Sequence, residues 1–152
     1  MSDRTTLLFA LPQYRLDVTP EPGGGRRVLV ESIAEQGGAP ACGVLSSVIR
    51  DRPVSRVKDL PHGLVSLLVF VGKRRFVCTQ VLCERRSFTE ATAELPARAR
   101  VTTHLKAKVC AAVTTTNRAV SEVENEHGIA WWTVHRILVK TAADLLGQAP
   151  PR

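Results

Sequence analysis

Hydrophobic and polar residues alternate with the two-residue period of β-strands over much of the first 90 residues. The clearest alternation lies at 27–33, where Val28, Val30 and Ser32 share one face of a strand. The glycine run before it lacks the Lys-Ser/Thr of a phosphate-binding loop and is typical of a hairpin turn. We therefore expect antiparallel β structure over residues 1–90. The other runs predicted to form strands are 7–11, 48–57, 64–71 and 76–78.

The hydrophobic period changes to that of α-helices after Pro96. A first helix is expected at 101–115, and the threonines at its end can stop it and cap the next helix. A second helix is expected at 118–127 and a third at 131–146. The chain is thus predicted to be an α+β protein with two domains. These are a β-rich, zinc-ribbon-like cysteine module at 1–95 and a three-helix, helix-turn-helix module at 96–152.

The segment 119–140 has the pattern of a helix-turn-helix, in which a short turn containing glycine joins two helices. Gly128 stands where a left-handed backbone is needed, and Ile129 would fill the space between the helices. Val134 would lie on the buried side of the second helix. Glu124 stands where such motifs usually have a small residue, so its side chain is expected to point outward. Pairs of short helices around a glycine also occur in proteins that bind no DNA.

The second helix of such a motif enters the major groove of DNA. Arg136 is the best candidate for a base contact, because arginine pairs bidentately with guanine. Lys140 and Arg118 suit phosphates, and Asn117 can donate to a phosphate at a helix N-terminus. Trp131 shares a face with buried positions, which favours core packing over DNA contact. The candidate DNA-binding residues are Asn117, Arg118, Trp132, Thr133, His135, Arg136 and Lys140.

The charge of the chain favours a polyanionic partner. The net charge is +7, and 16 of the 21 basic residues are arginine, which grips phosphate and guanine through two hydrogen bonds. No apolar run approaches the length that spans a bilayer, and the first ten residues do not have the pattern of a secretion signal. We expect a cytoplasmic, nucleoid-associated protein that binds double-stranded DNA and no membrane, with a homodimer as a candidate assembly.

Cysteine spacing indicates a metal site. Cys78 and Cys83 follow a strand at a distance from which one turn can present two thiolates, and Cys42 lies in a turn of the knuckle type. A structural zinc site wants four ligands, and the expected partner of Cys42, three residues earlier, is Ala39. Cys110, in the helical module, is interpreted as a small buried hydrophobe. The fourth position could be taken by water, His62 or Glu84; alternatively the cysteines bind no metal.

Several segments resemble the N-terminal zinc-binding region of insertion-sequence transposases of the ISL-three family, and the stretch 115–138 is similar to the helix-turn-helix of that family. The resemblance covers nearly the whole chain and implies binding to the terminal inverted repeats of a mobile element. Ala39 departs from it, because the family has a cysteine there. The segments that carry the resemblance are 39–43, 57–61, 74–78, Cys83 and 87–90.

The resemblance also bears on catalysis, because the family continues beyond this region into a domain whose carboxylate triad holds divalent metals. The 14 acidic residues here form no such cluster, so we expect a DNA-binding fragment that is not an enzyme. The alternatives are a small transcriptional regulator derived from a transposase and a zinc-dependent protein-interaction module; a hydrolase is the weakest alternative. The β module is expected to add phosphate contacts through Lys73, Arg74, Arg75, Arg85 and Arg86.

Overall fold

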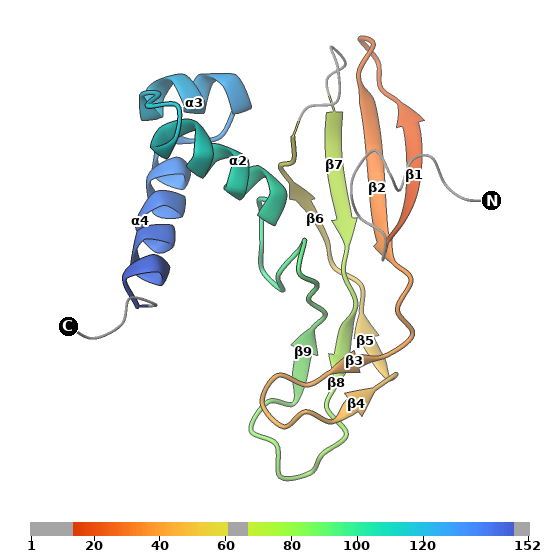
Figure 1. The fold of residues 1–152 in the computed structure, drawn as a ribbon. Coiled ribbons are helices and arrows are strands. Elements are labelled where there is room, and N and C mark those ends of the chain that lie inside the picture. The colour runs from red at the N-terminus through yellow and green to blue at the C-terminus, as the bar shows by residue number, and fades with distance from the viewer. Residues whose placement is uncertain (1–13, 61–66, 148–152) are drawn as a thin grey trace. The chain divides into compact units, whose positions relative to one another are not determined.

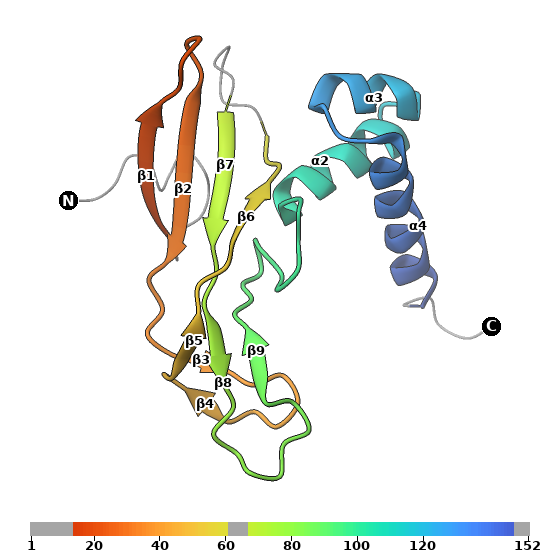
Figure 2. The same ribbon diagram turned by 180° about the vertical axis from the view of Figure 1, so that it is seen from behind.

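The computed structural model describes residues 14–60 and 67–147 and shows an α+β protein, as predicted (Figure 1, Figure 2). The chain divides into two compact units, Met1–Thr102 and Thr103–Arg152, which we call the β unit and the helical unit. This division falls a few residues after the boundary expected at 95/96. Among the described residues, no helix has both the length and the hydrophobicity needed to cross a membrane.

The larger sheet of the β unit has four strands in the order β1-β2-β7-β6. Antiparallel pairing joins β1 to β2 and β6 to β7, but β2 and β7 run parallel. The expectation of wholly antiparallel structure is therefore wrong at this pair. Between β2 and β7 the chain forms the first strands of two smaller sheets and then β6, and the remaining strands of the smaller sheets follow β7. The strands are β1 (Tyr14–Pro20), β2 (Arg26–Ser32), β6 (Val54–Val57) and β7 (Leu67–Gly72).

The alternation predicted for β2 is confirmed, since Val28, Val30 and Ser32 are all buried. The two valines belong to a core that also contains Tyr14, whose hydroxyl lies 2.9 Å from Thr92 Oγ1. The glycine run forms a turn, as predicted, and joins β2 to β1 in place of the run at 7–11; Gly23 and Gly24 adopt positive φ angles that other residues rarely tolerate. Strand β1 was not predicted, and the run expected at 7–11 lies outside the described residues.

Two smaller sheets make up the rest of the β unit. One has the order β5-β8-β9, and the other pairs β3 with β4. Their core holds Phe76 and Phe88, which face each other across β8 and β9 with ring centroids 5.7 Å apart. Gly37 packs so closely that an added Cβ would lie 2.7 Å from the Phe76 ring. The strands are β3 (Gly37–Gly38), β4 (Leu45–Ser46), β5 (Ile49–Asp51), β8 (Arg75–Val77) and β9 (Ser87–Thr89).

The helical unit contains α2 (Thr103–Thr114), α3 (Val120–His127) and α4 (Trp131–Gly147), close to the predicted helices. Leu105 and Val109 of α2 are buried, whereas Cys110 is half-buried and not the core residue expected. The threonine cluster does mark the end of α2, after which Asn117 adopts a positive φ and the Arg118 N–H donates back to the Ala112 carbonyl at 3.1 Å. It does not cap α3, whose N-cap residue is Ala119.

Candidate metal centre and nucleic-acid interface

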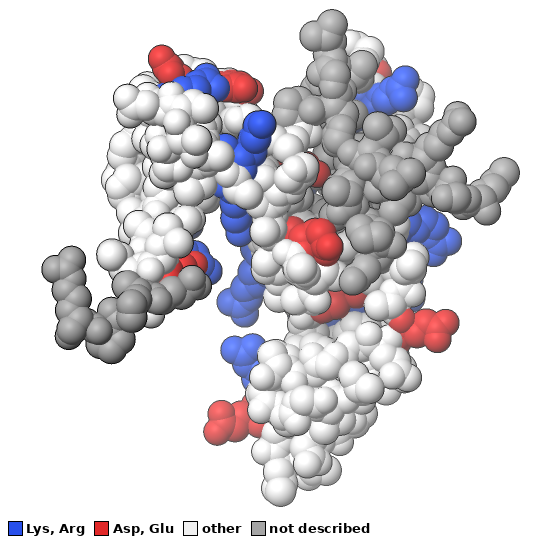
Figure 3. All heavy atoms as spheres, viewed as in Figure 1, with Lys and Arg blue, Asp and Glu red and all other residues white. Residues whose placement is uncertain are grey.

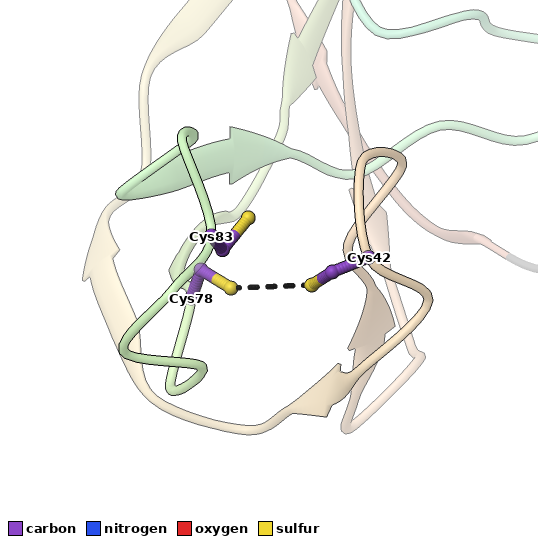
Figure 4. Close-up of side chains that lie close together, drawn as sticks. All are labelled: Cys42, Cys78 and Cys83. Carbon is purple, nitrogen blue, oxygen red and sulfur yellow. Dashed lines mark hydrogen bonds between the residues drawn. The ribbon is translucent and has the colours of Figure 1, made fainter.

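Three of the four cysteines meet in the β unit. The sulfur atoms of Cys42, Cys78 and Cys83 all lie within 4.8 Å of one another, as predicted from their spacing. Figure 4 shows Cys42 on one loop facing Cys78 and Cys83 on the opposite loop. The Cys42 and Cys78 sulfurs are 3.6 Å apart, far longer than a disulfide. Thiolates on one tetrahedral zinc ion at about 2.3 Å are separated by about 3.8 Å, so this spacing fits a metal site.

Backbone hydrogen bonds fix the two loops that carry these cysteines. Around Cys42, the Ala39 N–H donates to the Val44 carbonyl at 2.9 Å, and the Gly43 N–H donates to the Ala39 carbonyl at 2.7 Å. On the opposite loop, the Cys83 N–H donates to the Gln80 carbonyl at 3.1 Å. The two loops are therefore held by hydrogen bonds of their own main chain.

Ala39 occupies the place where a fourth ligand was expected. It is buried in the same cluster as Cys78, Cys83, Phe76 and Phe88, so a methyl group fills that side of the site. Among the described residues, no histidine or carboxylate joins the three cysteines. This removes Glu84 as a fourth ligand in this arrangement, and His62 lies outside the described residues. Within residues 14–60 and 67–147 the site therefore offers three cysteine sulfurs as ligands.

The thiols of Cys42 and Cys78 differ in acidity. The backbone N–H of Val44, and then the neighbouring Cys78 thiol, lower the pKa of the exposed Cys42 thiol. The backbone N–H of Gln80 favours the Cys78 thiolate, but burial and the adjacent sulfurs outweigh it and raise the pKa of Cys78. Because a metal binds the thiolate, the lower pKa of Cys42 would favour it over Cys78 as a ligand.

The turn between α3 and α4 has the geometry predicted from the sequence. Gly128 is in the left-handed conformation, with φ 57° and ψ 38°, and its N–H donates to the Glu124 carbonyl. Val123, Ile129 and Val134 are buried on either side of this turn. The Glu124 carboxylate does not simply point outward, because it accepts a 3.2 Å hydrogen bond from the Trp131 N–H. Glu124 thus caps α4 and links the two helices.

The first turns of α4 carry a cluster of aromatic rings. Trp131 stacks on His135 with centroids 5.1 Å apart and an interplanar angle of 11°, and Trp132 meets Trp131 edge-on. The expectation that Trp131 packs in the core is wrong, since 38% of its surface is exposed. A pattern of shared faces cannot show this, because whether a helical face is covered depends on the neighbouring elements.

The candidate DNA-binding residues of α4 lie on its accessible side. Trp132, His135, Arg136 and Lys140 are exposed, and Thr133 is half-buried. Neither Arg136 nor Lys140 forms an ion pair within residues 14–60 and 67–147.

Arg118 and Asn117 are placed differently. Arg118 pairs with Glu126 and, at 3.7 Å, with Glu122, and these carboxylates raise its pKa. The positive charge of Arg118 is therefore paired with two carboxylates of the helical unit. Asn117 has a φ of 53° and shapes the turn before α3. It is not at the helix N-terminus from which it was expected to meet a phosphate, because Ala119 is the N-cap.

Most of the β-unit cations expected to meet phosphate have internal partners. Lys73 is buried, which overturns its expected role, and its ammonium group donates to the carbonyls of residues 95–97. Arg74 donates to the Ser32 carbonyl at 2.8 Å, and Arg75 pairs with Asp51 at 3.3 Å. Arg85 and Arg86 are exposed.

Comparisons of the chain with protein-family models, with curated proteins and with solved structures gave no match. The resemblance to ISL-three family transposases therefore stays a prediction from residue patterns.

Proposed function

We propose that the chain binds duplex DNA in a sequence-specific manner, with α4 as the helix that enters the major groove. The observation that carries this proposal is the exposed row of Trp132, Arg136 and Lys140, which recur every four residues and so share one side of α4. Behind this row, Val134 is buried, so the helix is anchored while its cationic side stays accessible.

Each residue in this row has a distinct role. Arg136 would read a guanine through two parallel hydrogen bonds, and Lys140 would hold a phosphate without reading sequence. Trp132 would pack on sugar or on the thymine methyl group, because an indole ring offers a large apolar face. The resemblance to transposases would make the target the terminal inverted repeats of a mobile element.

The three cysteines support a structural zinc ion as part of the same proposal. Cys42, Cys78 and Cys83 would hold the metal, and the observed sulfur spacing suits it. The ion would supply a cross-link between the two loops, in addition to the buried cluster that Ala39 forms with Cys78 and Cys83. Because one ligand is missing, purified protein should carry less than one zinc per chain, and Ala39→Cys should raise the occupancy. An unchanged zinc content in Ala39→Cys would contradict this part of the proposal.

Selection from a random pool of DNA duplexes tests the proposal. The full chain should enrich a defined motif, and Arg136→Ala should lose the preference at one position of it. Arg15→Ala serves as a matched control, because Arg15 is exposed on β1 and lies outside the helical unit. Recovery of no motif by a folded protein, or the same motif by Arg136→Ala, would overturn the assignment of α4.

A zinc-dependent protein-interaction module is the second candidate. It is favoured by Val81 and Leu82, which lie between the paired cysteines and are 77% and 89% exposed. Two large apolar side chains at the tip of a metal-held loop suit contact with another protein. Folded, zinc-loaded protein that binds no DNA at low salt would favour this candidate over the first.

A further inference from the structure

The β unit contains a cavity of about 600 Å³ with a strongly cationic lining. Five basic side chains surround it: Lys73, Arg75, Arg85, Arg98 and Arg100. Among the described residues, no aspartate or glutamate lines it. Figure 3 shows Lys and Arg side chains gathered along the side of the β unit that β9 borders. A concentration of like charge around one hollow favours an anionic occupant.

Two of the five cations have partners that belong to the fold. Arg75 pairs with Asp51, and the buried ammonium group of Lys73 donates to the carbonyls of Leu95, Pro96 and Ala97. Lys73 thereby holds the segment that leads into residues 97–100, which line one side of the cavity. Lys73 therefore positions this side of the cavity and also adds positive charge to it.

The other three cations are available to a ligand. Arg85, Arg98 and Arg100 are exposed, and none of them forms an ion pair within the part of the chain that the structure describes. They come from two separate segments, one after Cys83 and one after Ala97, that converge on the same cavity. Guanidinium groups that line one cavity without a carboxylate give it a positive potential, which favours binding of an anion.

The uncharged residues that line the cavity indicate which class of anion it suits. The hydroxyl side chains of Ser55, Ser87 and Thr89 can donate hydrogen bonds, and the buried ring of Phe88 gives an apolar wall. Arginine forks match the geometry of phosphate oxygens, and the volume is in the range of sites for small ligands. We propose that this cavity binds a phosphate ester, held by Arg85, Arg98 and Arg100. The site does not involve α4, so the proposal stands independently of the recognition helix.

Titration calorimetry of the full chain tests the site, with inorganic pyrophosphate, adenosine triphosphate and a short DNA duplex as three separate probes. The variant combines Arg98→Gln with Arg100→Gln. The matched control combines Arg15→Gln with Arg26→Gln, two exposed arginines that do not line the cavity. Because a hydrogen bond to a charged group is worth about tenfold in affinity or more, the variant should bind at least about tenfold more weakly than the control.

The three probes separate the two sources of a phosphate. Weaker binding of pyrophosphate and nucleotide with unchanged duplex binding assigns the cavity to a free phosphate compound, and weaker binding of all three probes assigns it to phosphate groups from either source. Loss of duplex binding alone assigns it to a nucleic-acid backbone. Arg85→Gln, on the other wall, should reproduce the result if the double variant folds poorly, and Arg136→Ala should leave pyrophosphate binding intact. Equal affinity of variant and wild type for all three probes, or no binding of any probe, overturns the proposal.

Discussion

Lys73 and Lys140 have the same side chain and opposite surroundings. Lys73, in the β unit, is 3% exposed and donates to main-chain carbonyls of residues 95–97, whereas Lys140 stands exposed on α4. The two lysines differ because the main chain near each of them has different hydrogen-bonding needs. An irregular segment has carbonyls that no strand or helix satisfies, and a lysine can satisfy them. The interior of α4 satisfies its own main-chain groups, so its cations stay available for a partner.

Phe76 in the β unit and Trp132 on α4 differ in the same way as the two lysines. Replacing Phe76 should give the largest loss of stability. Phe76→Ala should lower the free energy of unfolding of the β unit by about 3–5 kcal/mol, because the fully buried ring leaves a cavity behind. Trp132→Ala should leave stability nearly unchanged and weaken DNA binding, since 68% of the indole is exposed. Urea denaturation of both variants checks this. Comparable losses of stability would show that α4 is not free on that side.

The next largest effect is expected from replacing Lys73 and Lys140, which should change different properties of the protein. Lys73→Met should cost about 1–3 kcal/mol of stability, because it removes the hydrogen bonds from the buried ammonium group to the carbonyls of residues 95–97. Lys140→Met should leave the melting temperature unchanged and lower the affinity for every DNA sequence alike. Calorimetric melting and fluorescence anisotropy at one salt concentration measure the two quantities. A stable Lys73→Met protein would contradict the structural role given to that ammonium group.

The turn before α4 should be sensitive to a single methyl group. Gly128→Ala places a Cβ on a left-handed backbone, which costs about 1–2 kcal/mol. Gly147→Ala is the control, because Gly147 ends α4 with open space around an added Cβ and no positive φ. Equal stability of the two variants in thermal denaturation would show that the turn does not depend on this conformation.

Much of the helical unit could be predicted from the sequence, because the helical period and the position of Gly128 are local properties. The β unit could be predicted only in part. The alternation of β2 and the meeting of Cys42 with Cys78 were foreseen, but the parallel pairing of β2 with β7 depends on how the intervening chain folds. The burial of Lys73 likewise depends on carbonyls more than twenty residues away in the sequence.

The smallest expected effect is a difference in the rate at which two cysteines of the cluster react, and it involves no change in the stability of the protein. In metal-free protein, iodoacetamide should modify Cys42 before Cys78, since Cys42 is exposed and has the lowered pKa while Cys78 is buried and has a raised one. As the pH falls, Cys42 should be the last of the two to lose its thiolate. Peptide mass spectrometry over time measures both rates. Faster modification of Cys78 would contradict the observed placement of the two loops.

The most direct measurement of the central claim is the ratio of affinities for the selected duplex and for a scrambled one. At fixed salt, Arg136→Ala should lower this ratio by roughly 5- to 150-fold, because one bidentate guanine contact is lost. Lys140→Ala should weaken both affinities and leave the ratio unchanged. An Arg136→Ala protein that keeps the wild-type ratio would contradict the assignment of α4 as the helix that reads DNA.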